Sequence, residues 1–253
     1  MCGRFAVDSE VNDLIEEFVA QGGDVHDWRP SYNIRPTDPI PVVIESVRRN
    51  GDAAGELQRR LELARWSLTP SWSKDLKMKG PTFNARSETA ATTSMFRASV
   101  EGKRALIPVT GYYEWHTDAT GPGKPRKTPY FIHDPSGDDF AFAGLYSWWR
   151  DRSRPDDDPE RWVLTATILT MDAVPHLRAI HDRNPVPLPR ELWQHWLDPS
   201  LIGDEQLVRE AVAAGTELAE RLEFYEVAPV TGEGPETMRP LHPGAEASSG
   251  QGG

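Results

Sequence analysis

The sequence predicts a single α+β domain followed by a disordered tail. The chain has 253 residues, of which 38% are hydrophobic, enough for one substantial core, and no shift in composition divides it. Segments with strand-like patterns are interleaved with a few segments of helical periodicity. After about Gly232 the chain is polar and rich in glycine and proline. We therefore expect a domain over residues 2–231 and a disordered tail over residues 232–253.

Strands are expected where apolar residues alternate with polar ones or form short runs between turn residues. The segments with this pattern are 40–46, 57–66, 104–115, 128–134, 139–149, 161–172 and 223–230. The strands at 128–134 and 139–149 are expected to pair, because only a short turn that contains Gly137 separates them.

Helices are expected where apolar residues recur at intervals of three and four. The segments with this spacing are 8–20, 189–197 and 204–222. Asp8 or Ser9 should cap the first helix, since either side chain can accept hydrogen bonds from backbone N–H groups. The motif FNARSETA (83–90) is expected to end a strand and to begin a capped helix that continues towards Met95.

The number of cysteines and the N-terminal sequence argue against disulfide-bonded, metal-binding, secreted and membrane-spanning proteins. Cys2 is the only cysteine, which excludes an intramolecular disulfide and a multi-cysteine metal site. The spacing of His176 and His181 does not match the helical zinc signature, so neither a metal nor another cofactor is expected. Because no secretory signal or membrane span is recognisable, we expect a soluble cytoplasmic protein that has no membrane partner.

Positive charge is concentrated in one stretch of an acidic chain. The net charge is −11, yet residues 57–104 carry ten lysines and arginines against four acidic residues. Trp66 and Trp72 lie in the same stretch. Cations for phosphates and flat rings for bases are what a groove for single-stranded nucleic acid requires. The alternative interpretation is a solvated face above two core tryptophans.

The start of the chain carries an unusual pair of nucleophiles. Removal of Met1 would leave Cys2 with an α-amine beside its thiol, groups that titrate at about 7.7–8.0 and about 8.5 when unperturbed. Such a 1,2-aminothiol can condense with an aldehyde to a Schiff base and then close a thiazolidine ring. It can also hydrolyse an amide, with the amine as general base. Cys2 can equally be a buried packing residue.

Four further residues are candidates for a site. Asn84 and Arg86 lie at a strand-to-helix junction, where loops often carry function. Glu114 follows an apolar strand and is flanked by aromatic residues, so partial desolvation would make it a candidate acid or base. His181 could transfer protons beside the cation of Arg183. Each also has a structural interpretation, as a turn residue, a salt-bridged glutamate or a core histidine.

Six motifs, in this order and spacing, resemble the SOS response-associated peptidase (SRAP) family. They are MCGRF, YNIRPT, WSLTPSWSKD, FNARSETA, IPVTGYYEW and IHDRNPV, and the resemblance covers roughly residues 2–230. It implies an α+β domain in which antiparallel strands form a barrel-like core with peripheral helices. It also implies a sensor and shield of abasic sites in single-stranded DNA, which joins the lesion through Cys2 in a thiazolidine crosslink.

The resemblance also implies roles for individual residues. The implied catalytic residues are Cys2, Asn84, Glu114 and His181. Asn84 would orient the amine or thiol, Glu114 would act as acid and base in dehydration, and His181 would move protons during ring opening and reversal. The implied DNA contacts are Arg4, Trp72, Arg86, Thr170 and Arg183. The arginines would hold phosphates, Trp72 would stack beside a base, and Thr170 would make a backbone contact.

Two features depart from the family pattern. Arg35 stands where a small residue is more usual, and the segment VAPVTGEGPETMRPL lacks an asparagine-bearing ending. Two other functions also stay open: a peptidase that uses Cys2, whose action could be limited to removing Met1, and a non-catalytic single-strand binding module. Replication-fork proteins are candidate partners, and no coiled-coil pattern demands more than a monomer.

Overall fold

A closed five-stranded barrel lies at the centre of the protein. The computed structural model describes residues 2–18, 20, 25, 27–47, 55–119 and 124–242. In ring order the barrel strands are β3 (Pro39–Val47), β4 (Leu57–Trp66), β10 (Trp162–Asp172), β9 (Phe140–Arg150) and β6 (Arg104–Val109), which pairs with β3 again. Among the neighbouring strands of this barrel, β4 and β10 are the one parallel pair, and the other pairs are antiparallel. The predicted α+β class with a barrel-like core of antiparallel strands is therefore confirmed.

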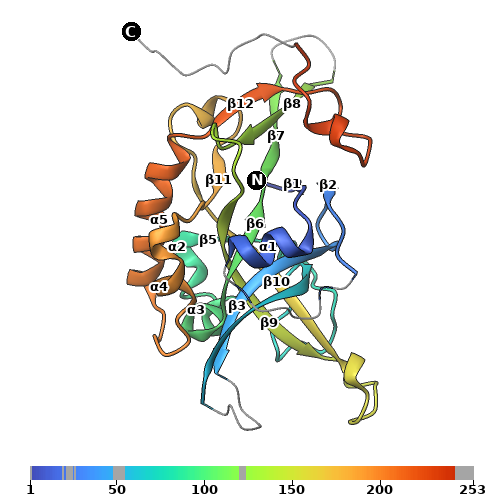
Figure 1. Cartoon of the computed structure of the whole chain (residues 1–253), viewed down its shortest axis with the longest axis vertical. Helices are drawn as coiled ribbons and strands as arrows, with labels where there is room; N and C mark the ends of the chain where they lie inside the picture. The colour runs from blue at the N-terminus through green and yellow to red at the C-terminus, as the bar shows by residue number, and fades with distance from the viewer. Residues whose placement is uncertain are drawn as a thin grey trace.

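A second, antiparallel sheet extends the barrel (Figure 1). Its order is β12 (Glu223–Glu226), β8 (Arg126–His133), β7 (Gly111–Asp118), β1 (Phe5–Val7) and β2 (Ser31–Ile34). The expected pairing of 128–134 with 139–149 is wrong, because β8 pairs with β7 and β12 while β9 pairs with β6 and β10. The hairpin formed by β7 and β8 thus determines the partner of β8.

The expected strand 104–115 is two strands in two different sheets. Thr110 separates β6 from β7, and its backbone N–H donates to the Ala6 carbonyl at 2.9 Å. Its hydroxyl also contacts the carboxylates of Asp8 and Asp139, both at 2.8 Å. These bonds hold the chain where it passes from the barrel to the second sheet, which places β7 beside the N-terminal strand β1.

Two short strands flank the end of β10. β5 (Asn84–Arg86) runs parallel to it, with Asn84 opposite Ile168 and Arg86 opposite Thr170. β11 (Arg183–Pro185) runs antiparallel to it. The FNARSETA and IHDRNPV motifs are therefore brought to the same end of one barrel strand.

The helices lie at the periphery, and Figure 1 shows α2, α4 and α5 on one flank of the strands. They are α1 (Val11–Glu17), α2 (Ser87–Ala90), α3 (Arg97–Gly102), α4 (Trp193–Leu197) and α5 (Glu205–Ala219). The described residues also form four short 3₁₀ helices, η1 (Pro159–Arg161), η2 (Leu177–Ala179), η3 (Arg190–Leu192) and η4 (Pro235–Met238). In the described part of the chain, no helix is long and apolar enough to cross a membrane.

Two predicted helix starts differ from the structure. The N-cap of α1 is Glu10, whose side chain makes no capping bond. The predicted caps Asp8 and Ser9 do not cap the helix, because their side chains are hydrogen-bonded to Thr110 and Asp139. The helix predicted from Ser87 towards Met95 already ends at Ala90. The separate helix α3 was not predicted.

Residues 232–242, expected to be disordered, pack against the domain. Thr237 is buried, and its hydroxyl lies 3.0 Å from the Tyr113 hydroxyl. The Tyr225 hydroxyl donates to the Met238 carbonyl at 2.7 Å. These tyrosine contacts hold a segment whose composition alone indicates a tail. Residues 243–253 lie outside the described residues.

Replacing Gly215 by alanine should destabilise the fold, although alanine favours exposed helices by about 1 kcal/mol. A Cβ at this position of α5 would lie 2.7 Å from the Pro187 carbonyl and 2.8 Å from a Val186 methyl. We expect a loss of about 1–3 kcal/mol in the free energy of unfolding, measured by urea denaturation. Ala213→Gly at an exposed position of the same helix controls for propensity. A higher midpoint for Gly215→Ala would contradict the close contact.

Candidate active site

Cys2 is fully buried at the start of the described chain and is held by its backbone. Its carbonyl accepts a hydrogen bond from Asn84 Nδ2 at 2.6 Å, and its Sγ lies 3.7 Å from the Arg4 carbonyl. Asn84 is itself fixed where β5 pairs with β10. Among the described residues, the buried Oδ1 of Asn84 has no hydrogen-bond partner. Asn84 therefore fixes Cys2 through its amide nitrogen and retains an acceptor.

Glu114 is the charged group that acts on the Cys2 thiol. Its side chain is buried on β7, the neighbour of β1. Burial raises the pKa of the Cys2 thiol far above its ordinary range, and the negative charge of Glu114 raises this pKa further. The thiol is consequently protonated at neutral pH.

Tyr112 belongs to the same cluster and was missed in the sequence. Burial raises its pKa well above the usual value, and the charges of Cys2 and Glu114 add to this shift. Tyr112 and Glu114 are two residues apart on β7, so their side chains lie on one face of the strand. Tyr113 has the opposite orientation and donates its hydroxyl to the Tyr32 carbonyl at 2.8 Å. In the motif GYYEW, side chains alternate between the two faces of the strand. Tyr112 could therefore have been placed on the same face as Glu114 from the sequence.

His181 completes the cluster on the other side of Glu114. Its Nδ1 lies 3.8 Å from Glu114 Oε1 and 2.7 Å from Asp182 Oδ1. The same Nδ1 lies 3.0 Å from the backbone N–H of Arg183. A neutral Nδ1 can accept from that N–H, whereas a protonated Nδ1 can donate to the Asp182 carboxylate. The tautomer decides which of the two contacts is a hydrogen bond, because Nδ1 accepts in one tautomer and donates in the other.

A contact behind this cluster sets the position of His181. His116 on β7 is hydrogen-bonded through Nδ1 to the Ala179 carbonyl at 2.8 Å. The turn that carries His181 is thereby attached to the strand that carries Glu114. The four predicted catalytic residues, Cys2, Asn84, Glu114 and His181, are thus brought together from four separate segments.

Replacing Glu114 by glutamine should lower the pKa of the Cys2 thiol. The carboxylate disfavours the thiolate, so its removal moves thiolate formation to lower pH, while burial keeps the pKa above that of an exposed cysteine. Thiolate absorbance near 240 nm measures this shift once the absorbance of the ionised tyrosines is subtracted, since Cys2 is the only cysteine. A Cys2→Ala variant supplies the baseline. An unchanged or higher thiol pKa would contradict the electrostatic coupling.

Two of the three predicted phosphate-binding arginines remain accessible. Arg4 is half-buried, donates from Nη1 to Asn33 Oδ1 at 2.6 Å, and lies 5.7 Å from the Trp115 ring centroid. Burial lowers its pKa, and the charge of Arg35 lowers it further. Arg86 is exposed next to Asn84, and no carboxylate in the described ranges forms an ion pair with it. Asn33 and Trp115 are neighbours of Arg4 that the sequence did not reveal as such.

Arg183 is occupied by internal partners. Its guanidinium makes paired hydrogen bonds to the two Glu88 oxygens at 2.7 and 2.9 Å, and another to Asp172 at 2.6 Å. It also donates to the Thr170 carbonyl at 2.8 Å. Only 11% of the side chain is exposed. The phosphate contact of Arg183 stays a prediction, and a phosphate would have to replace the Glu88 and Asp172 carboxylates on its guanidinium.

Thr170 does not present its side chain to a ligand. It is fully buried, and its hydroxyl lies 3.4 Å from the Ala85 carbonyl. The pairing of β5 with β10 covers this side chain, and the predicted backbone contact of Thr170 stays a prediction.

The two tryptophans of the basic stretch have different surroundings. Trp66 is fully buried and donates from Nε1 to the Phe83 carbonyl at 2.8 Å, whereas Trp72 is 56% exposed. The adjacent Ser73 carbonyl accepts from Trp149 Nε1 at 3.0 Å. Trp149 pairs with Val163 on β10, whereas Asn84 of the Cys2 cluster pairs with Ile168. Five residues of a strand separate these two positions by about 16 Å. Trp72 is thus an exposed ring away from the Cys2 cluster.

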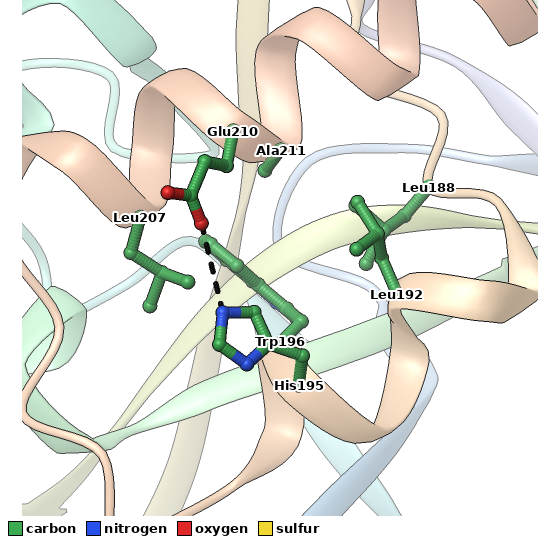
Figure 2. Close-up of a pocket in the computed structure, with 7 residues that line it drawn as sticks. All are labelled: Leu188, Leu192, His195, Trp196, Leu207, Glu210 and Ala211. Atoms are coloured by element: carbon green, nitrogen blue, oxygen red, sulfur yellow. Dashed lines mark ion pairs between the residues drawn. The ribbon is translucent and has the colours of Figure 1, made fainter.

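Several hollows in the surface lie outside the Cys2 cluster. The one in Figure 2, beside the His195–Glu210 ion pair, has a volume of about 10 Å³, enough for about one water molecule. Larger hollows of about 190, 410 and 630 Å³ are each lined by other residues. Within the described residues, no group of three or more histidine, cysteine, aspartate or glutamate side chains could hold a metal ion.

Comparisons with known proteins identify a family model and relatives that this chain resembles. A family model described as SOS response associated peptidase (SRAP) matches residues 1–233. The abasic site processing protein YoqW of Bacillus subtilis is 37% identical over 201 residues, which cover 79% of this chain and 81% of YoqW. The abasic site processing protein HMCES of Gallus gallus is 30% identical over 244 residues, covering 86% of this chain and 68% of HMCES.

A solved structure shares the fold. A protein from Bacteroides thetaiotaomicron superimposes with a TM-score of 0.75 at 21% sequence identity. The superposition covers 95% of this chain and 100% of that protein. The similarity therefore extends over the barrel and the second sheet together.

Proposed function

Since the chain belongs to the SOS response associated peptidase family, we propose that it processes abasic sites in single-stranded DNA and captures them covalently through Cys2. The observation that carries this proposal is the cluster of Asn84, Glu114 and His181 around the only cysteine of the chain. An abasic deoxyribose opens to an aldehyde at C1′, and an N-terminal cysteine is suited to trap an aldehyde.

The chemistry begins at the α-amine that Met1 removal exposes. The amine adds to C1′, and loss of water from the carbinolamine gives a Schiff base. The thiol then adds across the C=N bond, forming a C–S bond while its proton passes to the nitrogen. The products are one thiazolidine and one water. Burial and the charge of Glu114 raise the pKa of the Cys2 thiol, which favours the amine as the first nucleophile in this scheme.

The neighbouring groups have separate tasks in this scheme. Asn84 holds the Cys2 carbonyl through its amide nitrogen, and in this scheme its Oδ1 accepts a hydrogen bond from the new amine. As a carboxylate, Glu114 takes a proton from the attacking amine and then gives it to the departing hydroxyl. His181 moves protons in opening the sugar ring and in reversing the crosslink, using the two states of Nδ1.

Arg4 and Arg86 are the proposed phosphate contacts, and Trp72 is the proposed stacking residue. Arg183 becomes a positioning residue, which ties β10 to Glu88 at the start of α2. The basic stretch favours single strands or junctions over intact duplex. Equal binding to unmodified duplex at physiological salt would contradict this preference.

The test mixes methionine-processed protein with single-stranded DNA that carries one abasic site, followed by a denaturing gel. A variant that retains Met1 and DNA without the lesion are the controls. We expect a heat-stable shifted band only with processed protein and abasic DNA. If mass spectrometry shows that Met1 is absent and no band forms, the proposed capture is wrong, and peptide substrates become the next test.

A further inference from the structure

We propose that the hollow between β4 and β10 is a nucleotide subsite, in which Trp162 stacks on a base and Arg65 binds a phosphate of the strand that flanks the lesion. This inference rests on the proposed function, because it takes single-stranded DNA as the ligand. The hollow has a volume of about 630 Å³ and is lined by residues outside the Cys2 cluster.

The hollow arises where two parallel strands stop pairing. β4 and β10 pair only at Arg65 with Thr165 and at Trp66 with Ala166. Because the strands are parallel, the residues that precede these pairs lie at the same end of both strands. The segments Leu63–Arg65 and Trp162–Leu164 line the hollow on its two sides. The opening therefore lies where β4 and β10 are not paired, and Thr37, Pro159 and Glu160 also line it.

Arg65 supplies a cation without an ion-pair partner among the described residues. Its Nη1 donates a long hydrogen bond to the Ser67 carbonyl, at 3.4 Å. Burial lowers its pKa. A partly desolvated guanidinium with donors to spare suits a phosphate, which can accept two of its N–H groups together.

Trp162 supplies an exposed ring on the opposite side of the hollow. Its side chain is 45% exposed. Arg161 lies 5.5 Å from the ring centroid and pairs with Asp156 at 2.7 Å, so its position above the ring is held. The hollow also contains Glu160, whose carboxylate pairs with Arg154 at 2.8 Å. A ring, an unpaired cation and a neutralised acid together match the chemistry of a nucleotide.

The loop of residues 35–38 connects this hollow to the region of Cys2. Arg35 and Asp38 lie near enough to Arg4 to shift its pKa. Thr37 lines the hollow and donates its backbone N–H to the Trp66 carbonyl at 2.8 Å. Its φ of 84° is uncommon for a β-branched residue and marks a constrained turn. A strand that leaves the lesion past Arg4 reaches the hollow across this loop.

The test measures binding of intact oligothymidylate by fluorescence anisotropy, which does not require the covalent reaction. Trp162→Ala should weaken binding by about 5- to 150-fold, as stacking of one base predicts, whereas Trp162→Phe should retain most of the affinity. Arg65→Gln should weaken binding and reduce the slope of log affinity against log salt by about 0.7. Arg65→Lys should keep the slope. Arg209→Gln, on the exposed face of α5, controls for loss of any surface cation.

A second comparison locates the subsite relative to the lesion. Abasic oligonucleotides with a long flank on only the 5′ or only the 3′ side should differ, and Trp162→Ala should weaken binding for one polarity alone. Unchanged affinity and salt slope in both Trp162→Ala and Arg65→Gln would overturn the subsite, even if Cys2 captures the lesion. In that case the exposed strand edges of the hollow would favour a peptide. Weakened binding without any crosslink would instead support the subsite and contradict the proposed capture.

Discussion

Replacing Cys2 by alanine should abolish the heat-stable complex with abasic DNA completely, because the variant has lost the thiol that closes the ring. Its amine can still form a Schiff base, which is hydrolysed unless it is reduced. Addition of cyanoborohydride should therefore restore a band for Cys2→Ala. Unmodified single-stranded DNA should bind to this variant as it does to the unaltered protein.

Cys2→Ser distinguishes capture from peptide hydrolysis. A serine amine and hydroxyl cannot form a thiazolidine, yet an N-terminal serine can serve as nucleophile in amide hydrolysis. Loss of the crosslink without peptide cleavage supports covalent capture. Hydrolysis of a peptide substrate by Cys2→Ser would favour the peptidase interpretation, and full activity of Cys2→Ala would favour a binding module without catalysis.

Replacing Glu114 by glutamine should slow crosslink formation by about 10²- to 10⁴-fold, the usual contribution of a positioned acid or base. Glutamine keeps the shape of the side chain but cannot transfer the proton in carbinolamine dehydration. The rate is measured from quenched time points on a denaturing gel at saturating DNA. Glu101→Gln, at an exposed position of α3, is the matched control and should react at the unaltered rate.

The direction of the Glu114→Gln effect carries additional information. The substitution also removes the charge that raises the pKa of the Cys2 thiol, so it makes the thiolate more accessible. If deprotonation of the thiol limited the reaction, Glu114→Gln would react faster. A slower reaction together with a lower thiol pKa would establish proton transfer to the substrate as the task of Glu114. A rate within twofold of the unaltered protein would contradict a catalytic role.

The two departures from the family pattern meet at one place in the structure. Arg35 forms an ion pair with Glu233, and the Asn33 side chain donates to the Gly232 carbonyl at 2.6 Å. Asn33 also accepts from Arg4. Arg35 and the segment after Val230 are therefore in contact beside Arg4, a proposed phosphate contact. In the sequence, Arg35 and Glu233 are almost 200 positions apart.

Local sequence patterns determined much of the fold and the reactive group. The β3, β4 and β10 strands were predicted within a few residues, because their apolar runs and turn boundaries are local properties. The position of Cys2 and the order of the six motifs identified the family. Asn84, Glu114 and His181 were also recognised from those motifs, and the structure brings them to one cluster.

Tertiary structure decided which side chains are available to act. Arg183 and Glu88 are 95 positions apart, so no local pattern could show that this cation is already paired. Thr170 and Trp66 are covered by segments distant in the chain, whereas Trp72 and Trp162 remain exposed. The parallel pairing of β4 with β10, which leaves the hollow beside Arg65, also depends on contacts between distant segments. The same is true of the separation of β6 from β7 at Thr110. Burial and ion pairing arise between residues that only folding brings together, which is why the sequence determined the chemistry of Cys2 but not its surroundings.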